Sequence, residues 1–278
     1  MLIDFHTHCF PDALAEKAIK KLAGIASMPY YSEGTAASTL AVMDRAGVDY
    51  AVVCNIATNV RQQQNVNRFA VTLHQTQPRL CPLGSIHPES PLDVTCAELD
   101  GLKAAGIPGI KVHPDYMEAF FDDPRFLVIF EECARRGLFV VTHAGYDFYS
   151  PNLIHSTPDR IRKVHRALPD LKIVAAHFGG NLLYDEVISE LCGEDIWFDL
   201  SLLAVVNPDV EKIRRLIDAH SPDRLLFASD LPWCDPLDEL RALESLGLGD
   251  ERMEKIRYKN AAELLHSDKI PTENKKEQ

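Results

Sequence analysis

The chain has 278 residues, of which 46% are hydrophobic and 25% are charged, a balance that suits a globular α/β protein with a substantial core. Its 29 basic and 41 acidic residues give a net charge of −12, which argues against nucleic acid or an anionic membrane as the main partner. A small anionic substrate remains compatible with this charge, because a pocket can hold a local positive field.

The cysteines and the N-terminal segment indicate the compartment. The seven cysteines are scattered, and none forms a C-x-x-C pair, so we expect free, buried thiols in a reducing compartment. No basic segment followed by an apolar one precedes the first predicted strand. No apolar run approaches the ~18 residues that a spanning helix needs. We therefore expect a cytoplasmic protein.

Apolar runs rich in Val, Ile, Leu and Phe recur along the chain, as is typical of parallel strands buried on both faces. The runs cover residues 2–8, 48–57, 80–88, 107–114, 138–145, 171–180, 196–202 and 225–232. Helical patterns lie between them, and several begin at Pro or after Asp or Asn. These patterns cover residues 11–26, 92–105, 124–136, 158–168, 181–192 and 208–219, followed by 238–245 and a further helix at 251–265.

Eight strands alternating with helices predict a (β/α)₈ TIM barrel. We expect one domain over residues 1–267 with an extra C-terminal helix, and a flexible, charged C-terminal tail over 268–278. A doubly wound open sheet is the alternative, but no G-x-G-x-x-G motif follows the first strand. Residues 28–34 form either a lid or an ordinary surface loop.

The first predicted strand carries two histidines, His6 and His8, at the spacing of residues that share one face of a strand. Two adjacent imidazoles on one face can grip a single metal ion. The alternative is a pair of unrelated histidines, and the rest of the chain decides between the two.

Polar residues end most of the later strands. His87 ends the third strand, Lys111 and His113 the fourth, His143 the fifth, His177 the sixth and Asp230 the eighth. In a barrel these strand ends converge on one face, where active sites form. Burial of imidazoles and a carboxylate together is unfavourable unless they bind something, and a divalent cation is their natural partner.

We therefore assign His6, His8, His143 and Asp230 as ligands of one divalent metal ion. Zinc is the ion expected first, and manganese or another transition metal is the alternative. An open coordination position would hold water and lower its pKa toward ~7. His177 is the candidate general base for that water, and Asp230 can relay a proton.

Together, these strand-end residues resemble the amidohydrolase superfamily. Within it, the chain is similar to the amidohydrolase-2 branch, which includes aminocarboxymuconate-semialdehyde decarboxylase and related hydrolases. Further matching segments are GIKVHP at 109–114, HFGG at 177–180 and KNAAELL at 259–265. The resemblance implies one metal held by His6, His8, His143 and Asp230, and a water activated by His177. It also implies a homodimer, because related proteins often form dimers.

The role of the fourth strand is left open by the residues alone. Other branches of the superfamily carry a carboxylated lysine there that bridges two metals, whereas this branch generally uses one. We favour a single ion, with Lys111 as a cationic contact to the substrate, against a lysine satisfied inside the barrel. His113 has the same two alternatives, substrate contact or structural hydrogen bonding.

Weaker candidates surround this centre. His87, Tyr146 and Trp233 are expected to line the substrate pocket, and packing or capping roles are the alternatives. The remaining histidines fall on predicted helices or loops and are expected at the surface: His74, His155, His165, His220 and His266.

The sequence predicts a metal-dependent hydrolase in which metal-activated water attacks a carbonyl carbon of a small, carboxylate-bearing substrate. An alternative keeps the site but changes the reaction to non-oxidative decarboxylation of an unsaturated or aromatic carboxylic acid. A non-catalytic metal- or ligand-binding barrel is the third possibility. The candidate base beside four ligands argues against it, because structural metal sites tend to be closed.

Overall fold

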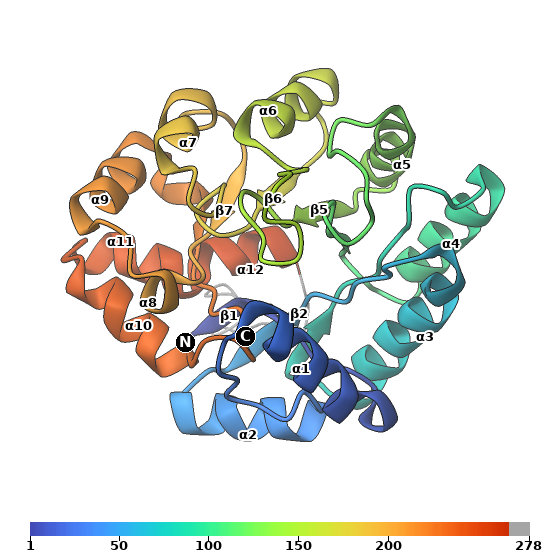
Figure 1. Cartoon of the computed structure of the whole chain (residues 1–278), viewed down its shortest axis with the longest axis horizontal. Helices are drawn as coiled ribbons and strands as arrows, with labels where there is room; N and C mark the ends of the chain where they lie inside the picture. Colours follow the sequence, from blue (N-terminus) through green and yellow to red (C-terminus); the bar gives the residue numbers. More distant parts are fainter. Residues whose placement is uncertain (267–278) are drawn as a thin grey trace, which may run out of the picture.

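The computed structural model describes residues 1–266, so the tail expected at 268–278 lies outside the described residues. Within them, parallel strands alternate with helices around a ring (Figure 1). The strands are β1 (Ile3–Thr7), β2 (Tyr50–Val53), β3 (Leu80–Pro82), β4 (Gly109–Val112), β5 (Phe139–Thr142), β6 (Ile173–Ala175), β7 (Trp197–Asp199) and β8 (Leu225–Leu226).

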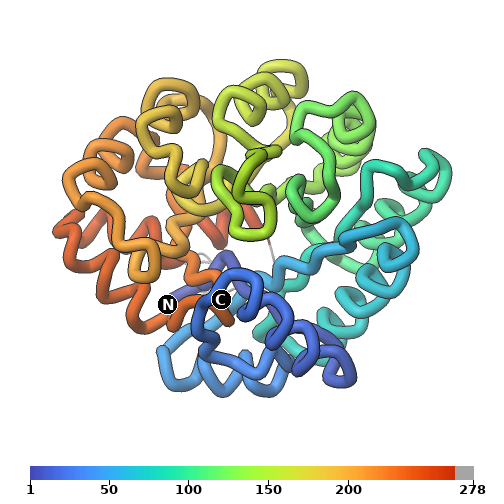
Figure 2. Tube along the Cα trace, viewed as in Figure 1, coloured from blue at the N-terminus to red at the C-terminus, as the bar shows by residue number. Residues whose placement is uncertain are grey.

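The strands form two parallel sheets, in the orders β1-β2-β3 and β4-β5-β6-β7-β8. Single bridges join the two sheets at both junctions, Gly84 with Ile110 and Thr7 with Leu231. In Figure 2 the blue first segment accordingly lies beside the orange last segments, where the ring closes. The expected barrel is confirmed.

Helices cover the outside of the ring. They are α1 (Asp12–Ala26), α2 (Ala36–Ala46), α3 (Val60–Thr76), α4 (Leu92–Ala104), α5 (Pro124–Arg135), α6 (Pro158–Ala167), α7 (Tyr184–Glu190), α8 (Leu203–Val206), α9 (Val210–Ala219), α10 (Pro236–Ser245), α11 (Asp250–Glu254) and α12 (Asn260–Leu265), with a 3₁₀ turn at Pro222–Arg224. α2, α3 and α8 add to the expected set. α7 is shorter than the predicted 181–192, because Leu182 has a φ of 61° that no α-helix accommodates. A π-helical segment, Lys255–Lys259, interrupts the helix predicted at 251–265.

Two apolar layers hold the barrel together. The outer layer packs strand residues such as Ile110 and Val140 against the helices, and the inner layer fills the barrel with residues such as Val52 and Val141. Residues of α12 belong to the inner layer, and the Asn260 side-chain amide donates to the Leu225 carbonyl at the start of β8. α12 therefore closes the end of the barrel where the strands begin, and the opposite end is left for a site (Figure 1).

The described residues contain no helix that is long and apolar enough to cross a membrane. None of the seven cysteines, all within the described residues, forms a disulfide, as expected; five are buried, and Cys96 and Cys192 are half-buried.

Gly145, directly after β5, sits where a side chain has no room. Its φ is +83°, and an added Cβ would lie 2.2 Å from the backbone nitrogen of Asn181. We expect Gly145→Ala to lower the free energy of unfolding by about 3 kcal/mol, from backbone strain and overpacking together. Gly193 is the matched control, because its φ is +88° but nothing lies within 4 Å of an added Cβ. Gly193→Ala should cost roughly 1 kcal/mol. Equal losses in urea titrations of the two variants would contradict this account.

Two histidines expected at the surface are buried, so those predictions are wrong. His155 Nδ1 donates to Asp115 Oδ1 at 2.8 Å. His220 Nε2 donates to the Ile196 carbonyl at 2.8 Å, and its ring stacks on Phe198 with 4.0 Å between ring centroids. Each ring makes a hydrogen bond with a residue that is distant in the sequence, and no local sequence pattern indicates such a contact. His266 is exposed as expected, and His74 and His165 are half-buried.

The burial of His220 predicts a pH dependence of stability. Burial lowers the pKa of His220 from 6.5 to about 4, so the unfolded chain binds a proton in this interval and the folded protein does not. Stability from this residue is complete above pH 6.5 and is lost as the pH falls toward 4, by up to about 1.4 kcal/mol per pH unit. We expect His220→Gln to make the free energy of unfolding, measured by urea titration, less dependent on pH between 4 and 6.5. An unchanged slope would refute the assignment.

Candidate metal centre

A bulge in β1 directs the two N-terminal histidines into the barrel. Three residue steps from Asp4 to Thr7 pair with two steps from Ala51 to Val53, so one extra residue shifts the alternation of side chains. Ile3 and Phe5 pack in the inner apolar layer before this shift, and His6 and His8 point inward after it. The expectation that both imidazoles share a face is therefore confirmed.

The segment after β8 brings Asp230 to these histidines. The Asp230 backbone N–H donates to the His6 carbonyl at 2.8 Å, and the His8 N–H donates to the Leu231 carbonyl at 2.6 Å. Asp230 has a φ of 64°, a conformation that aspartate tolerates better than most residues. Its Oδ1 lies 3.0 Å from His8 Nε2 and 3.5 Å from His6 Nε2.

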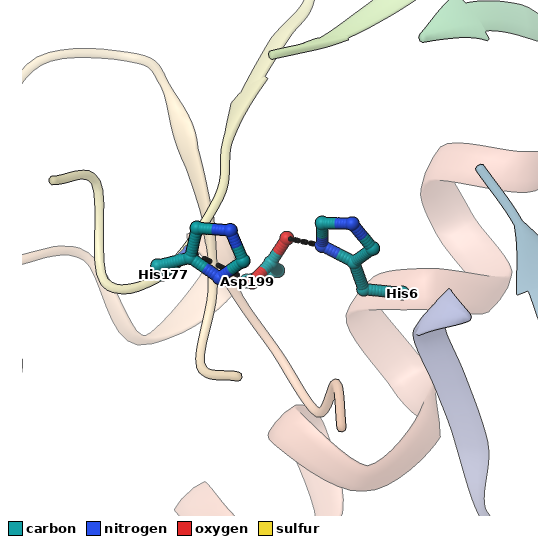
Figure 3. Close-up of side chains that lie close together, drawn as sticks. All are labelled: His6, His177 and Asp199. Atoms are coloured by element: carbon teal, nitrogen blue, oxygen red, sulfur yellow. Dashed lines mark hydrogen bonds and ion pairs between the residues drawn. The ribbon is translucent and has the colours of Figure 1, made fainter. Parts of the chain in front are cut away.

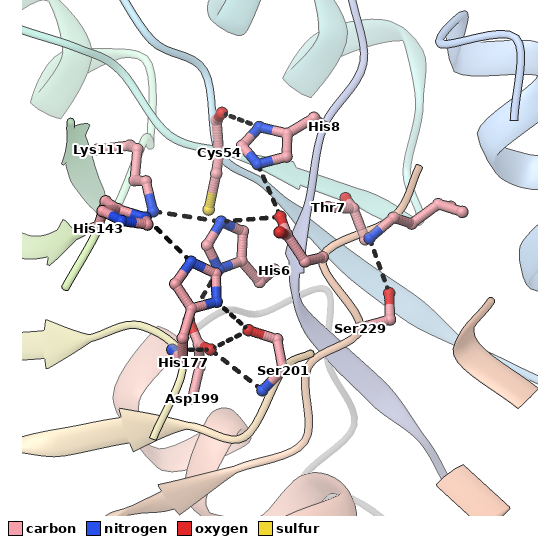
Figure 4. Close-up of polar contacts among 12 residues, drawn as sticks. His6, Thr7, His8, Cys54, Lys111, His143, His177, Asp199, Ser201 and Ser229 are labelled. Atoms are coloured by element: carbon pink, nitrogen blue, oxygen red, sulfur yellow. Dashed lines mark hydrogen bonds and ion pairs between the residues drawn. The ribbon is translucent and has the colours of Figure 1, made fainter. Parts of the chain in front are cut away.

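Hydrogen bonds define the tautomers of His6 and His8. His6 Nδ1 lies 2.8 Å from Asp199 Oδ2 (Figure 3), and His8 Nδ1 lies 2.8 Å from the Cys54 carbonyl oxygen (Figure 4). A carboxylate and a carbonyl only accept hydrogen bonds, so both Nδ1 atoms carry the proton. The lone pair of His6 is therefore on Nε2, 3.2 Å from the Lys111 Nζ donor, whereas both nitrogens of His8 face acceptors, the Cys54 carbonyl and Asp230 Oδ1.

The charge states suit a cation. Burial acts to raise the pKa of Asp230, but interactions with His6, His8 and His177 outweigh it and hold that pKa well below the ordinary 3.8. Burial, together with the nearby Lys111 ammonium, lowers the pKa of His6, so this imidazole is neutral. The ligand atoms of His6, His8 and Asp230 lie within 4.8 Å of one another. Two imidazole lone pairs and an ionised carboxylate are a donor set that fits a divalent metal ion.

The fourth predicted ligand, His143, directly follows β5 and contacts His177 rather than the other three predicted ligands. Its Nδ1 is 3.1 Å from His177 Nε2, and its buried Nε2 has no hydrogen-bond partner among residues 1–266. The structure groups His143 with His113 and Asp147, with ligand atoms within 4.8 Å. It thus brings three of the four predicted ligands together, and metal ligation by all four residues stays a prediction.

His177, the candidate base, is anchored on both sides. Its Nδ1 lies 2.7 Å from Ser201 Oγ, and its backbone N–H donates to Asp199 Oδ1 at 2.9 Å. Burial lowers the pKa of His177 well below 6.5, so the imidazole is neutral. Its ring stacks on that of His6 with 5.2 Å between centroids. The base predicted from sequence therefore lies beside the candidate metal ligand His6.

Lys111 brings positive charge into the same centre. Its side chain is 1% exposed, and its Nζ lies 3.2 Å from His6 Nε2 (Figure 4). Among the described residues, no carboxylate forms an ion pair with it. This arrangement places a buried ammonium, whose charge also interacts with Asp199, beside the candidate metal ligands.

The other predicted contacts differ in their distance from the centre. The His113 ring stacks on His143 and on Tyr116, with centroids 4.3 and 3.7 Å away, respectively. His87 Nδ1 accepts the Glu89 N–H at 3.2 Å, which is the capping alternative for that residue. Trp233 is half-buried in the turn after Asp230. Tyr146 is half-buried too, with its ring at the edge of Phe148.

Sequence reasoning missed several residues of this centre, above all Asp199 and Ser201. Asp199 ends β7 and contacts both His6 and His177. The rule applied to the other strands, namely to mark the last polar residue, finds Ser201 when it is extended to the run at 196–202, and Asp199 is the polar residue before it in that run. Tyr116 lies in a turn, where no such rule applies.

Comparisons with known proteins agree with this fold. None of the curated proteins compared with the chain matches it in sequence. Among solved structures, an apo IDCase from Metarhizium anisopliae is 19% identical, with a TM-score of 0.72, covering 97% of this chain and 98% of that one. A 5-carboxyvanillate decarboxylase from Novosphingobium aromaticivorans, complexed with manganese and 4-hydroxy-3-methoxy-5-nitrobenzoic acid, is 15% identical, with a TM-score of 0.73 and 96% of each chain covered.

A third structure is that of a probable 2-pyrone-4,6-dicarboxylic acid hydrolase from Acinetobacter baumannii with citric acid bound. It is 17% identical, with a TM-score of 0.67, covering 96% of this chain and 99% of that one. The family model named Amidohydro_2 and described as amidohydrolase matches residues 3–266, nearly the whole chain. With the barrel and its converging imidazoles and carboxylate, this match shows that the chain belongs to the amidohydrolase-2 family.

Proposed function

We propose that this protein is a metal-dependent decarboxylase that acts on a small aromatic or unsaturated carboxylic acid. The observation that carries the proposal is the buried Lys111 ammonium beside His6. No carboxylate among the described residues contacts this ammonium directly, and a buried charge is stabilised by a paired counter-ion, so a substrate carboxylate is the partner that we propose for Lys111. This is the decarboxylation alternative of the sequence analysis, placed ahead of hydrolysis.

Two further observations favour loss of carbon dioxide over attack by water. His6, His177 and Asp230 are all buried, which limits the water that reaches the centre. The His177 Nε2 atom, which would deprotonate a water, is engaged by His143 at 3.1 Å. The manganese-bound 5-carboxyvanillate decarboxylase structure lends support from a protein of the same fold.

In the proposed reaction, the bond between the substrate carbon and its carboxylate breaks and carbon dioxide leaves. A proton replaces the carboxylate at that carbon, so atoms and charge balance. A divalent ion held by His6, His8, Asp230 and His143 would act as a Lewis acid that holds and polarises the substrate. Zinc is the first expectation for this ion and manganese the alternative.

The protein's own residues do the rest. Lys111 binds and neutralises the substrate carboxylate before the bond breaks. The burial of the centre excludes water, which strengthens these electrostatic contacts. Asp230 and His177 are the groups that move the proton, because both adjoin the ligand cluster.

Hydrolysis is the second candidate, and one observation favours it. Because Ser201 holds the Nδ1 side of His177, the Nε2 side carries a lone pair that can take a proton from water. Asp230 would then relay that proton to the leaving group. The 2-pyrone-4,6-dicarboxylic acid hydrolase structure shows that a probable hydrolase has this fold.

The deciding experiment is product analysis of purified protein loaded with Zn²⁺ or Mn²⁺. Hydroxybenzoates, including 2,6-dihydroxybenzoate, and a lactone panel are incubated in D₂O and, separately, in ¹⁸O-labelled water. We expect carbon dioxide release with deuterium at the carbon that lost the carboxylate. Incorporation of ¹⁸O without carbon dioxide would replace decarboxylation by hydrolysis. No turnover of any panel member by metal-loaded protein would favour a non-catalytic barrel.

The role of Lys111 has its own test. We expect Lys111→Met to reduce kcat/KM for a carboxylate substrate by about 100-fold or more, as is typical when a charged partner is removed from a dry site. Lys103→Met is the control, because Lys103 is exposed at the end of α4. Full activity of Lys111→Met would remove the observation on which the proposal depends.

A further inference from the structure

We infer that Asp199 is a positioning residue that presets the tautomers of three histidines, His6, His177 and His143, so that each presents its Nε2 lone pair. The inference deepens the proposed function and rests on it for the role of His6 as a metal ligand. Asp199 is fully buried at the end of β7, and its two oxygens serve different histidines (Figure 3).

The first oxygen acts on the metal side. Asp199 Oδ2 accepts the His6 Nδ1–H at 2.8 Å, which leaves the lone pair on Nε2, the atom that faces Asp230. A carboxylate in this position orients a ligating imidazole and raises its basicity. The Nδ1–H of His8 is held by a backbone carbonyl instead. Of these two histidines, His6 is therefore the one whose tautomer depends on a side chain, Asp199.

The second oxygen acts on His177 through Ser201. Ser201 Oγ lies 2.5 Å from Asp199 Oδ1, and a carboxylate oxygen cannot donate, so the hydroxyl proton points to Asp199. Ser201 Oγ must then accept from His177 Nδ1–H, 2.7 Å away. This leaves the His177 lone pair on Nε2 (Figure 4).

The chain of donors continues to His143. Because His177 Nε2 carries a lone pair, the contact of 3.1 Å with His143 Nδ1 is a hydrogen bond donated by His143. The His143 lone pair is then on Nε2, the buried atom without a hydrogen-bond partner among residues 1–266. Through this chain of hydrogen bonds, the Asp199 carboxylate places the lone pair of His143 on Nε2, the atom that has no hydrogen-bond partner among residues 1–266.

An amide cannot replace this carboxylate. Asparagine has one acceptor oxygen and one donor nitrogen, whereas Asp199 meets donors at both oxygens: His6 Nδ1–H at Oδ2, and the His177 N–H and Ser201 hydroxyl at Oδ1. Asp199→Asn must set a donor against a donor on one side. Ser201→Ala breaks only the second arm and leaves His6 supported.

The test measures Zn²⁺ affinity by chelator competition and imidazole tautomers by ¹⁵N NMR, without substrate. We expect Asp199→Asn to lower Zn²⁺ affinity by about 10- to 100-fold, as is typical for the loss of a partner of a ligating histidine. Ser201→Ala should lower Zn²⁺ affinity less, and should remove the Nδ1–H tautomer preference of His177 and His143 but not of His6. Ser156→Ala, at an equally buried serine, should resemble wild type.

Unchanged Zn²⁺ affinity in folded Asp199→Asn, or unchanged His177 and His143 tautomers in Ser201→Ala, would overturn the inference. If Asp199→Asn does not fold, the Ser201→Ala spectra decide. Tautomers measured in metal-free wild-type protein separate this inference from the proposed function. A barrel that fails to decarboxylate any substrate but holds all three histidines as Nδ1–H tautomers would refute only the proposed function.

Discussion

Asp230→Ala is expected to lose its metal and its activity together. Asp230 Oδ1 faces both His6 Nε2 and His8 Nε2, and it is the anionic member of that three-residue ligand cluster. Outer partners of metal ligands are worth 10- to 100-fold in affinity, so removal of a ligand should cost more than about 100-fold. Turnover should fall to background, because the proposed reaction also assigns proton transfer to Asp230.

Metal content by elemental analysis and kcat on the same preparation check this prediction. Asp235→Ala is the matched control, since Asp235 caps α10 through the Leu237 N–H and pairs with Arg45. We expect the control to lose stability but keep its metal. A fully metallated and active Asp230→Ala protein would exclude Asp230 from the centre.

His177→Asn is expected to abolish turnover while leaving metal content near normal. His177 is a neutral imidazole whose Nδ1 is held by Ser201, and it stacks on His6 without joining the His6, His8 and Asp230 cluster. Loss of a positioned acid–base group typically reduces the rate by about 10²- to 10⁴-fold. The reduction should appear in kcat and remain at saturating substrate.

His165→Asn on α6 serves as the control, because this half-buried histidine lies on the outer ring of helices. Its kcat and metal content should match those of wild type. If His177→Asn instead loses its metal, the division between ligand and base is wrong, and His177 belongs among the ligands.

Much of the barrel could be predicted because strands buried on both faces leave apolar runs at regular spacing. The run at 107–114, for example, contains β4, and its last polar residue is the predicted site residue His113. The short α8 and the π-helical segment could not be predicted, because neither has a distinctive sequence period. The burial of His155 and His220 was missed for a related reason: their partners, Asp115 and Ile196, are 40 and 24 residues away in the chain.

By itself, the sequence determined most of the chemical groups that meet at the mouth of the barrel, because polar residues at the ends of parallel strands point to the same face. Only the tertiary structure decided how those groups pair. The bulge in β1 rotates His6 and His8 inward, and His6 meets Asp199 across 193 residues of chain. His143 Nδ1 contacts His177 rather than joining the cluster of His6, His8 and Asp230. Such pairings depend on the register and closure of the sheet, and these arise only when all strands have packed.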